Sequence, residues 1–324
     1  MLISRTPFRI SLGGGSTDLP SYCGKHGGFI FGVAIKMYMD IFVRTPIIYD
    51  KIDLQYLKFE SVDSIDQLQH PIGKEVLKIV GLNKAISIYF KSDTPMGTGL
   101  GSSGACAVGL LNALWNYKGV NKTQEELAEE AFQITQRLGL PDGRQDPYLA
   151  ALGGFTVLEL GADNGVSWRH PHIDTDTIKK FLSNSLFFYT GVRRDSVEVL
   201  RDQSRDRALE LKHRMKEIGR QILTAFENGS LDDFGHLMNE HWQLKKEMSD
   251  KITSPEFDAV YAQTLKSGAL GGKLIGAGGG GYFLFYCKDE DSRKQASVAM
   301  QKAGFKEIPL DIDYRGTRSV DISL

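Results

Sequence analysis

The sequence predicts a protein of mixed helices and strands in two domains. A chain of 324 residues is long enough for two domains and a large core. Its first half holds runs rich in β-branched and aromatic residues, which are typical of strands. Its second half shows apolar residues at steps of three and four, which are typical of amphipathic helices. A polar stretch at residues 162–177 reads as a connector, so we expect domains at 1–165 and 166–324.

Each expected element of the first half rests on a local pattern. Pro7 marks an edge or a bulge in the first strand. Pro20 begins a short helix, which Asp18 is placed to cap. Thr123 and Glu126 have the spacing of a capping box, which begins a helix. Strands are expected at residues 3–12, 29–48 (two strands), 85–90 and 155–160, and helices within 64–80, over 105–115, from 124, and after residue 146.

The second half reads as two long helices followed by a smaller set of elements. We interpret the charged residues between the apolar positions of these helices as solvated faces, and the histidines on them as structural or surface residues. Strands are expected at residues 186–190 and 282–286, with two more at the C-terminal end, and helices at 208–226, 231–242 and 290–302.

Composition excludes several classes of protein. The net charge of −1 gives no reason to expect a nucleic-acid partner. No apolar run reaches the ~20 residues needed to cross a bilayer, and residues 1–7 do not open a signal peptide. Three cysteines far apart in the chain favour reduced thiols. We therefore expect a cytoplasmic protein that does not bind a membrane.

Of the 35 glycines, 14 lie in three clusters, and the second cluster is the most informative. Residues 95–104, Pro-Met-Gly-Thr-Gly-Leu-Gly-Ser-Ser-Gly, lie between an expected strand and an expected helix. Glycine permits positive φ and a close approach of a ligand to the backbone. The first turn of a helix presents unpaired N–H groups and partial positive charge. We favour a phosphate-binding loop over a bare strand-to-helix turn.

Two familiar phosphate loops do not fit this cluster. Gly99, Gly101 and Gly104 match G-x-G-x-x-G, but the dinucleotide fingerprint needs a strand after the helix, and a second helix follows here instead. The P-loop pattern is absent as well. A glycine loop of a third kind remains.

The other two glycine clusters lie at residues 13–15 and 271–281. The third leads into a strand, so it is either backbone pressed against a ligand or a β-bulge. Asp146 stands before Pro147, and on local grounds an N-cap and a functional carboxylate are equally good interpretations. His170 and His172 are interpreted as solvated loop residues in preference to a metal pair.

In this order the three clusters resemble the motifs of the GHMP kinases, the family named for galacto-, homoserine, mevalonate and phosphomevalonate kinases. The resemblance runs from residue 3 to about 286. It implies an α+β fold: an N-terminal domain like ribosomal protein S5 domain 2 and a C-terminal ferredoxin-like domain, with the active site between them. It also implies ATP and Mg²⁺ as cofactors and a small-molecule substrate.

The resemblance assigns roles to particular residues. Asp146 matches the catalytic aspartate that accepts the proton of the substrate hydroxyl, and Arg9 matches the basic residue that stabilises charge on the transferred phosphoryl group. Ser103 matches the serine that contacts magnesium. The nucleotide-binding positions are Pro95, Gly97, Gly99, Leu100, Gly101, Ser102, Ser103 and Gly104.

One position departs from the family pattern. Many members carry a magnesium-binding glutamate on the helix before the catalytic aspartate, and Thr135 occupies that position here. A hydroxyl is a poorer magnesium ligand than a carboxylate, so weak or altered use of metal is a hypothesis.

Within the family, Gly-Gly-Gly-Ser-Thr-Asp-Leu-Pro is similar to the sugar 1-kinase branch, especially to kinases of D-glycero-D-manno-heptose 7-phosphate. The resemblance implies phosphorylation of the anomeric hydroxyl to the 1,7-bisphosphate, in nucleotide-activated heptose synthesis. The alternatives are a fucokinase-like sugar 1-kinase and a non-catalytic sensor. Lys25 is a further candidate cation for the sugar phosphate. The expected substrate-binding residues are Gly14, Gly15, Ser16, Thr17, Asp18, Arg144, Arg193, Arg194, Gly278 and Gly279.

Overall fold

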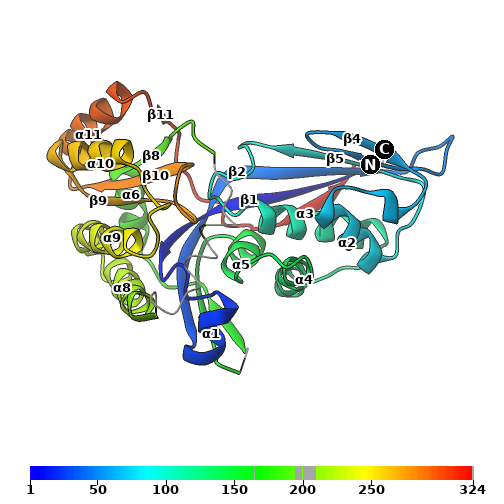
Figure 1. Cartoon of the computed structure of the whole chain (residues 1–324), viewed down its shortest axis with the longest axis horizontal. Helices are drawn as coiled ribbons and strands as arrows, with labels where there is room; N and C mark the ends of the chain where they lie inside the picture. Colours follow the sequence, from blue (N-terminus) through cyan, green and yellow to red (C-terminus); the bar gives the residue numbers. More distant parts are fainter. Residues whose placement is uncertain (164, 194–198, 200–208, 323–324) are drawn as a thin grey trace.

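The computed structural model describes residues 1–163, 165–193, 199 and 209–322, and it forms two sheets with helices packed against each. The larger sheet and helices α2 to α5 make one lobe, and the smaller sheet and helices α8 to α11 make the other (Figure 1). The long strands β1 (Leu2–Gly13) and β2 (Gly28–Arg44) run from the first lobe toward the second.

The larger sheet has eight strands in the described parts of the chain, in the order β12-β1-β2-β5-β3-β4, with β6 paired to β2 and β7 to β6. Strand β2 is long enough to pair with β6 through its first residues and with β5 through its last. Only β3 and β5 run parallel. The remaining strands are β3 (Ile52–Gln55), β4 (Phe59–Val62), β5 (Ile86–Ser92), β6 (Phe155–Leu160), β7 (Val166–Arg169) and β12 (Arg318–Asp321).

Two helices of this lobe, α2 and α4, begin at a residue whose side chain caps them. The Thr123 hydroxyl accepts a hydrogen bond from Glu126 N, and the Glu126 carboxylate accepts one from Thr123 N, which confirms the predicted capping box. The helices that precede β6 are α1 (Pro20–His26), α2 (Pro71–Val80), α3 (Ser102–Tyr117), α4 (Gln124–Arg137) and α5 (Gln145–Leu152), with a 3₁₀ turn, η1, at Ile65–Gln67.

The smaller sheet is antiparallel throughout, in the order β11-β8-β10-β9. Helices α9, α10 and α11 pack against its strands, and α8 packs against α9 and against β1 and β2 of the larger sheet. Its strands are β8 (Ser185–Tyr189), β9 (Ala269–Leu274), β10 (Tyr282–Cys287) and β11 (Lys306–Glu307), and its helices are α6 (Thr175–Asn184), α8 (Leu209–Glu227), α9 (Leu231–Lys246), α10 (Pro255–Lys266) and α11 (Glu290–Lys302).

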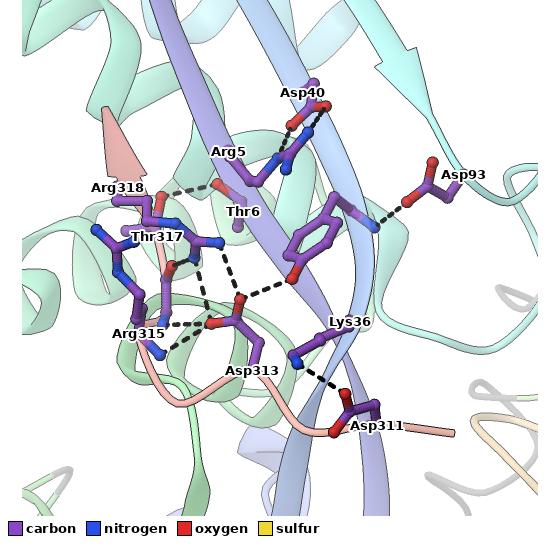
Figure 2. A network of polar contacts seen from close by, with 12 residues as sticks. Arg5, Thr6, Lys36, Asp40, Asp93, Asp311, Asp313, Arg315, Thr317 and Arg318 are labelled. Atoms are coloured by element: carbon purple, nitrogen blue, oxygen red, sulfur yellow. Dashed lines mark hydrogen bonds and ion pairs between the residues drawn. The ribbon is translucent and has the colours of Figure 1, made fainter. Parts of the chain in front are cut away.

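The end of the chain returns from the smaller sheet to the larger one, where a polar network holds it (Figure 2). The Asp313 carboxylate accepts hydrogen bonds from the Tyr38 hydroxyl at 2.9 Å and from the backbone N–H groups of Arg315 and Gly316. Arg318 forms an ion pair with the same carboxylate at 3.0 Å. The boundary expected near residue 165 stays a prediction, and the larger sheet continues beyond it through β7 and β12.

Three local predictions are wrong in ways that have a physical reason. Residues 29–48 form one long strand rather than two, because β2 pairs with different partners along its length. The connector at 162–177 contains β7, which pairs with β6. Asp146 lies in the first turn of α5, whose N-cap is Arg144. Cys23, Cys106 and Cys287 are free, buried thiols, as predicted. No helix in the described residues is long and apolar enough to cross a membrane.

Candidate active site

The glycine loop at residues 95–101 feeds directly into α3, as predicted. Gly97, Gly99 and Gly101 all have φ between 76° and 82°, the left-handed region that glycine adopts without strain. Gly101 is the N-cap of α3 and has no side chain to bond the first N–H groups of the helix. Those donors and the positive end of a 16-residue helix therefore face a cleft of about 300 Å³.

The first turns of α3 and α5 touch, and glycine makes this contact possible. A Cβ atom at Gly104 would lie 2.8 Å from the backbone and the Cβ atom of Asp146. A Cβ atom at Gly101 would lie 3.2 Å from the Arg9 Nε atom and from the Asp146 carboxyl carbon. The two glycines thus bring the glycine loop, Arg9 and Asp146 together.

Buried Arg9 and partly exposed Asp146 form an ion pair beside the loop. Arg9 is 3% exposed, and its Nε and Nη2 atoms donate to Asp146 Oδ1 at 2.9 and 2.6 Å. Its Nη1 atom donates to the Gly99 carbonyl at 2.6 Å. Asp146 is 21% exposed, and its other oxygen, Oδ2, has no hydrogen-bond donor among the described residues. The carboxylate is therefore fixed through one oxygen and open to the cleft through the other.

The first glycine cluster folds into a tight turn that presents Asp18. A Cβ atom at Gly14 would lie 1.9 Å from the Phe29 carbonyl oxygen, and Ser16 holds a φ of 73°. Asp18 Oδ2 accepts a hydrogen bond from Gln145 N at 2.9 Å, so Asp18 is tied to α5. It is not the cap of α1, whose N-cap is Leu19. Burial raises the pKa of Asp18 to about 6, with a further contribution from the charge of Asp146.

A third carboxylate, Asp142, lies beside Ser103, and sequence reasoning missed it. The Ser103 hydroxyl donates to Asp142 Oδ2 at 3.2 Å, and burial raises the pKa of Asp142 to about 6. Thr135, by contrast, is buried away from the cleft and donates to the Phe132 carbonyl. A carboxylate therefore lies beside Ser103 even though the matched helix position lacks one.

Several residues predicted to bind substrate lie outside the cleft or turn away from it. Thr17 is buried and donates to the carbonyls of Gly14 and Phe29. Arg144 forms a two-pronged ion pair with Glu129 at 2.9 and 3.0 Å. Gly279 N bonds the Ile252 carbonyl, and a Cβ atom at Gly278 would lie 2.9 Å from Ile252.

Arg193 and Lys25 are exposed and do not line the cleft, and Arg194 lies outside the described residues. Of the predicted nucleotide positions, Pro95, Leu100 and Gly104 do not line the cleft either. The predicted residues that do line the cleft are Arg9, Gly15, Ser16, Asp18, Gly97, Gly99, Gly101, Ser102, Ser103 and Asp146.

The C-terminal lobe supplies the opposite wall of the cleft, which sequence reasoning also missed. His241 and Lys245 of α9 and Lys273 of β9 line it and are buried. Lys245 lies beyond the helix expected at residues 231–242, so no role was predicted for it. The spacing of residues along α9 could have indicated that Lys245 is buried. Met238, His241, Trp242 and Lys245 share one face of the helix, and Met238 and Trp242 are fully buried apolar residues.

Two family models match the chain. The model of the GHMP kinases N terminal domain matches residues 67–154, and the model of the GHMP kinases C terminal region matches residues 222–306. Together they match more than half of the chain, and between them they include the glycine loop, Asp146 and the basic residues of α9 and β9.

Known proteins are similar to the chain over most of its length. A D-glycero-alpha-D-manno-heptose 7-phosphate kinase of Campylobacter jejuni is 25% identical over 315 residues, which cover 92% of this chain and 93% of that protein. An L-fucokinase/L-fucose-1-P guanylyltransferase of Bacteroides fragilis is 27% identical over 92% of this chain but only 35% of its own length. The crystal structure of a D-glycero-D-manno-heptose 1-phosphate kinase from Bacteroides thetaiotaomicron superposes with a TM-score of 0.83 at 24% identity, with both chains fully covered.

Proposed function

The chain belongs to the GHMP kinase family, and from this premise we propose that it transfers a phosphoryl group from ATP to the anomeric C1 hydroxyl of D-glycero-D-manno-heptose 7-phosphate. The product is the 1,7-bisphosphate, an intermediate for nucleotide-activated heptose. Members of the family are ATP-dependent kinases. A relative that is matched over 93% of its own length is a heptose 7-phosphate kinase, which supports the choice of sugar.

One observation carries the proposal: the Arg9–Asp146 ion pair lies against the first turn of α3, at the end of the glycine loop. Phosphoryl transfer needs a positioned acceptor for the hydroxyl proton and a concentration of positive charge at the phosphate. Asp146 Oδ2, open to the cleft, takes the proton of the C1 hydroxyl. Arg9 and the N–H groups of the loop and of α3 lie where they stabilise the negative charge of the phosphoryl group.

Arg9 has a second role in this scheme, which is to hold the base in place. Its guanidinium bonds both the Asp146 carboxylate and the Gly99 carbonyl, so the carboxylate keeps a fixed position relative to the loop. The Asp18 carboxylate accepts a hydrogen bond from the N–H of Gln145, the residue before Asp146. In our proposal Asp18 also accepts hydrogen bonds from the sugar hydroxyls. We leave Arg144 out of the proposed sugar site, because Glu129 occupies its guanidinium.

The residues around Ser103 fit a magnesium ion of the kind that nucleotides bring. No described group of three or more histidine, cysteine, aspartate or glutamate side chains is arranged to hold a metal alone. Magnesium in kinases is held by one or two carboxylates together with the phosphates. Ser103 and Asp142 would hold the ion, which when bound would neutralise charge on the phosphates.

The direct test is ADP release with ATP and Mg²⁺ over five acceptors: heptose 7-phosphate, free heptose, fucose, galactose and mevalonate. Turnover confined to heptose 7-phosphate supports the proposal. Preference for an unphosphorylated sugar such as fucose would replace it with a fucokinase-like activity, which the similarity to an L-fucokinase makes the second candidate. ATP binding without turnover of any acceptor would favour a sensor.

A further inference from the structure

Three basic side chains form a cluster on the C-terminal wall of the cleft. His241 and Lys245 are one turn apart on α9, so they share a face of that helix. Lys273 lies on β9, against which α9 packs. All three line the cleft that also holds Arg9 and Asp146.

The three side chains are buried, and only some of their hydrogen-bonding groups have partners among the described residues. The exposed fractions of His241, Lys245 and Lys273 are 1%, 5% and 2%. Lys273 donates to the Leu12 carbonyl at 2.8 Å, and Lys245 donates to the Gly276 carbonyl. An ammonium group has three donors, so each lysine keeps at least one more. Both ring nitrogens of His241 lack a partner among the described residues.

The charges nearest to the cluster are positive. No described carboxylate lies within ion-pair distance of Lys245 or Lys273. Each lysine is instead repelled by Arg9, and Lys273 is also repelled by Lys245. Burial is the main cause that lowers the pKa of Lys245 to about 7 and the pKa values of Lys273 and His241 well below their ordinary range. Burial thus disfavours the charged forms of these groups, a bound anion would favour them again, and the described chain supplies no such anion here.

We propose that His241, Lys245 and Lys273 form a phosphate-binding subsite on the C-terminal wall of the cleft. The inference rests on the proposed function, because the phosphate comes from a kinase substrate. Lys273 bonds the Leu12 carbonyl, just before the turn that carries Gly15 and Ser16, so the subsite adjoins the proposed sugar site. This position favours the ester phosphate of a sugar phosphate. Lys245 bonds Gly276, which abuts Gly99 of the loop, so the terminal phosphate of ATP is the second source.

The test uses variants that keep the shape of the wall. Lys245→Gln removes the charge but keeps an N–H donor for the Gly276 carbonyl. His241→Leu removes no hydrogen bond, because the described ring makes none. Lys246→Gln is the matched control: Lys246 is the next residue of α9, but it pairs with Asp258 at 3.1 Å and does not line the cleft. Thermal unfolding of each variant checks that the fold is retained.

Binding of inorganic phosphate, measured by calorimetry without nucleotide or sugar, gives a readout that does not depend on turnover. We expect Lys245→Gln to weaken phosphate binding at least tenfold and His241→Leu several-fold, while Lys246→Gln stays within twofold of the wild type. KM values then identify the source. A rise confined to KM for the sugar phosphate assigns the subsite to the sugar ester, and a rise confined to KM for ATP assigns it to the nucleotide.

If the phosphate affinity and the KM values remain unchanged in both Lys245→Gln and His241→Leu, the proposed subsite is refuted. The same data separate it from the proposed function. Wild-type turnover with free sugars only would remove heptose 7-phosphate as the substrate. A weaker phosphate affinity of Lys245→Gln in that case would still support the subsite, now with ATP as its source.

Discussion

One wall of the cleft is acidic and the other is basic, and the two sets of side chains have different kinds of hydrogen-bond partner. The N-terminal wall presents Asp18, Asp142 and Asp146, and each of them accepts a hydrogen bond from a donor of the chain: Gln145 N, the Ser103 hydroxyl or the Arg9 guanidinium. On the C-terminal wall, Lys245 and Lys273 bond only main-chain carbonyls among the described residues.

The carboxylates of the acidic wall have their partners within the chain, whereas the basic groups of the other wall keep donors for the phosphate that we propose. Fixed partners hold the carboxylates in position, as a proton acceptor and a sugar site require. The basic wall instead keeps spare donors on buried basic groups that become charged most readily when an anion is present, as the proposed phosphate would be. Four substitutions test this comparison and are given in order of decreasing expected effect.

Asp146→Asn removes the proposed proton acceptor from the acidic wall. Asparagine keeps an oxygen that can accept from Arg9, so the fold should hold, but its amide cannot take the proton of the hydroxyl. We expect kcat to fall by about 10²- to 10⁴-fold, the usual contribution of a general base. A kcat within fivefold of the wild type, in protein with an unchanged melting temperature, would refute the role of Asp146.

Gly99→Ala tests the contact between the glycine loop of the N-terminal wall and residues 275–276, which follow β9. Gly99 has a φ of 82°, and an added Cβ atom would lie 2.3 Å from the Ile275 carbonyl oxygen, on backbone that cannot easily move. Gly119→Ala is the control, because Gly119 has a φ of 74° but nothing within 4 Å of an added Cβ atom. We expect Gly119→Ala to lower the free energy of unfolding by about 1 kcal/mol and Gly99→Ala by ~2–4 kcal/mol. Equal losses in chemical denaturation would mean that the contact with Ile275 has no energetic weight.

Asp18→Asn should stabilise the protein at the expense of function. The pKa of Asp18 is raised to about 6, so the folded state binds the proton more tightly than the unfolded state, and stability falls as pH rises from about 4 to 6. Asp146, Asp142, Arg9 and Lys212 are charged groups that interact with it. Asparagine removes the cost of the buried charge, so we expect the variant to be ~1–3 kcal/mol more stable than the wild type at pH 8.

That gain should disappear below pH 4, where the wild-type carboxyl group is protonated. Denaturation at pH 8 and pH 3.5 checks the sign. A variant less stable than the wild type at pH 8 would show that the Asp18 charge stabilises the fold.

Asp142→Asn probes the metal. We expect the Mg²⁺ concentration for half-maximal activity to rise roughly tenfold, because a carboxylate beside Ser103 is lost. Thr135→Val is the control, since the Thr135 hydroxyl is directed to the Phe132 carbonyl and should leave the Mg²⁺ dependence unchanged. The reverse pattern, a shift with Thr135→Val alone, would return the metal site to the helix position that the family pattern suggests.

The sequence indicated the parts of the candidate site that are continuous in the chain, and the roles of these residues stay predictions. Arg9, the glycine loop and Asp146 each stand in a recognisable run of residues, and the structure brings them together. The α+β fold and the helix starts at Thr123 and Pro20 followed in the same way from local patterns and the family resemblance. What could not be predicted depends on distant packing. Lys245 looks like a solvated charge until α9 is placed against β9, and Arg144 looks free until α4 brings Glu129 to it.

The most direct test of the opposed walls is a steady-state comparison of Asp146→Asn and Lys245→Gln with ATP and heptose 7-phosphate. A base and a phosphate-binding cation act on different quantities. We expect that Asp146→Asn lowers kcat by at least about 10²-fold with little change in KM, and that Lys245→Gln has its main effect on KM for the phosphate-bearing ligand. A fall in kcat alone in both variants, with phosphate affinity intact, would contradict it: the two walls would then form one catalytic unit rather than a base opposite a phosphate site.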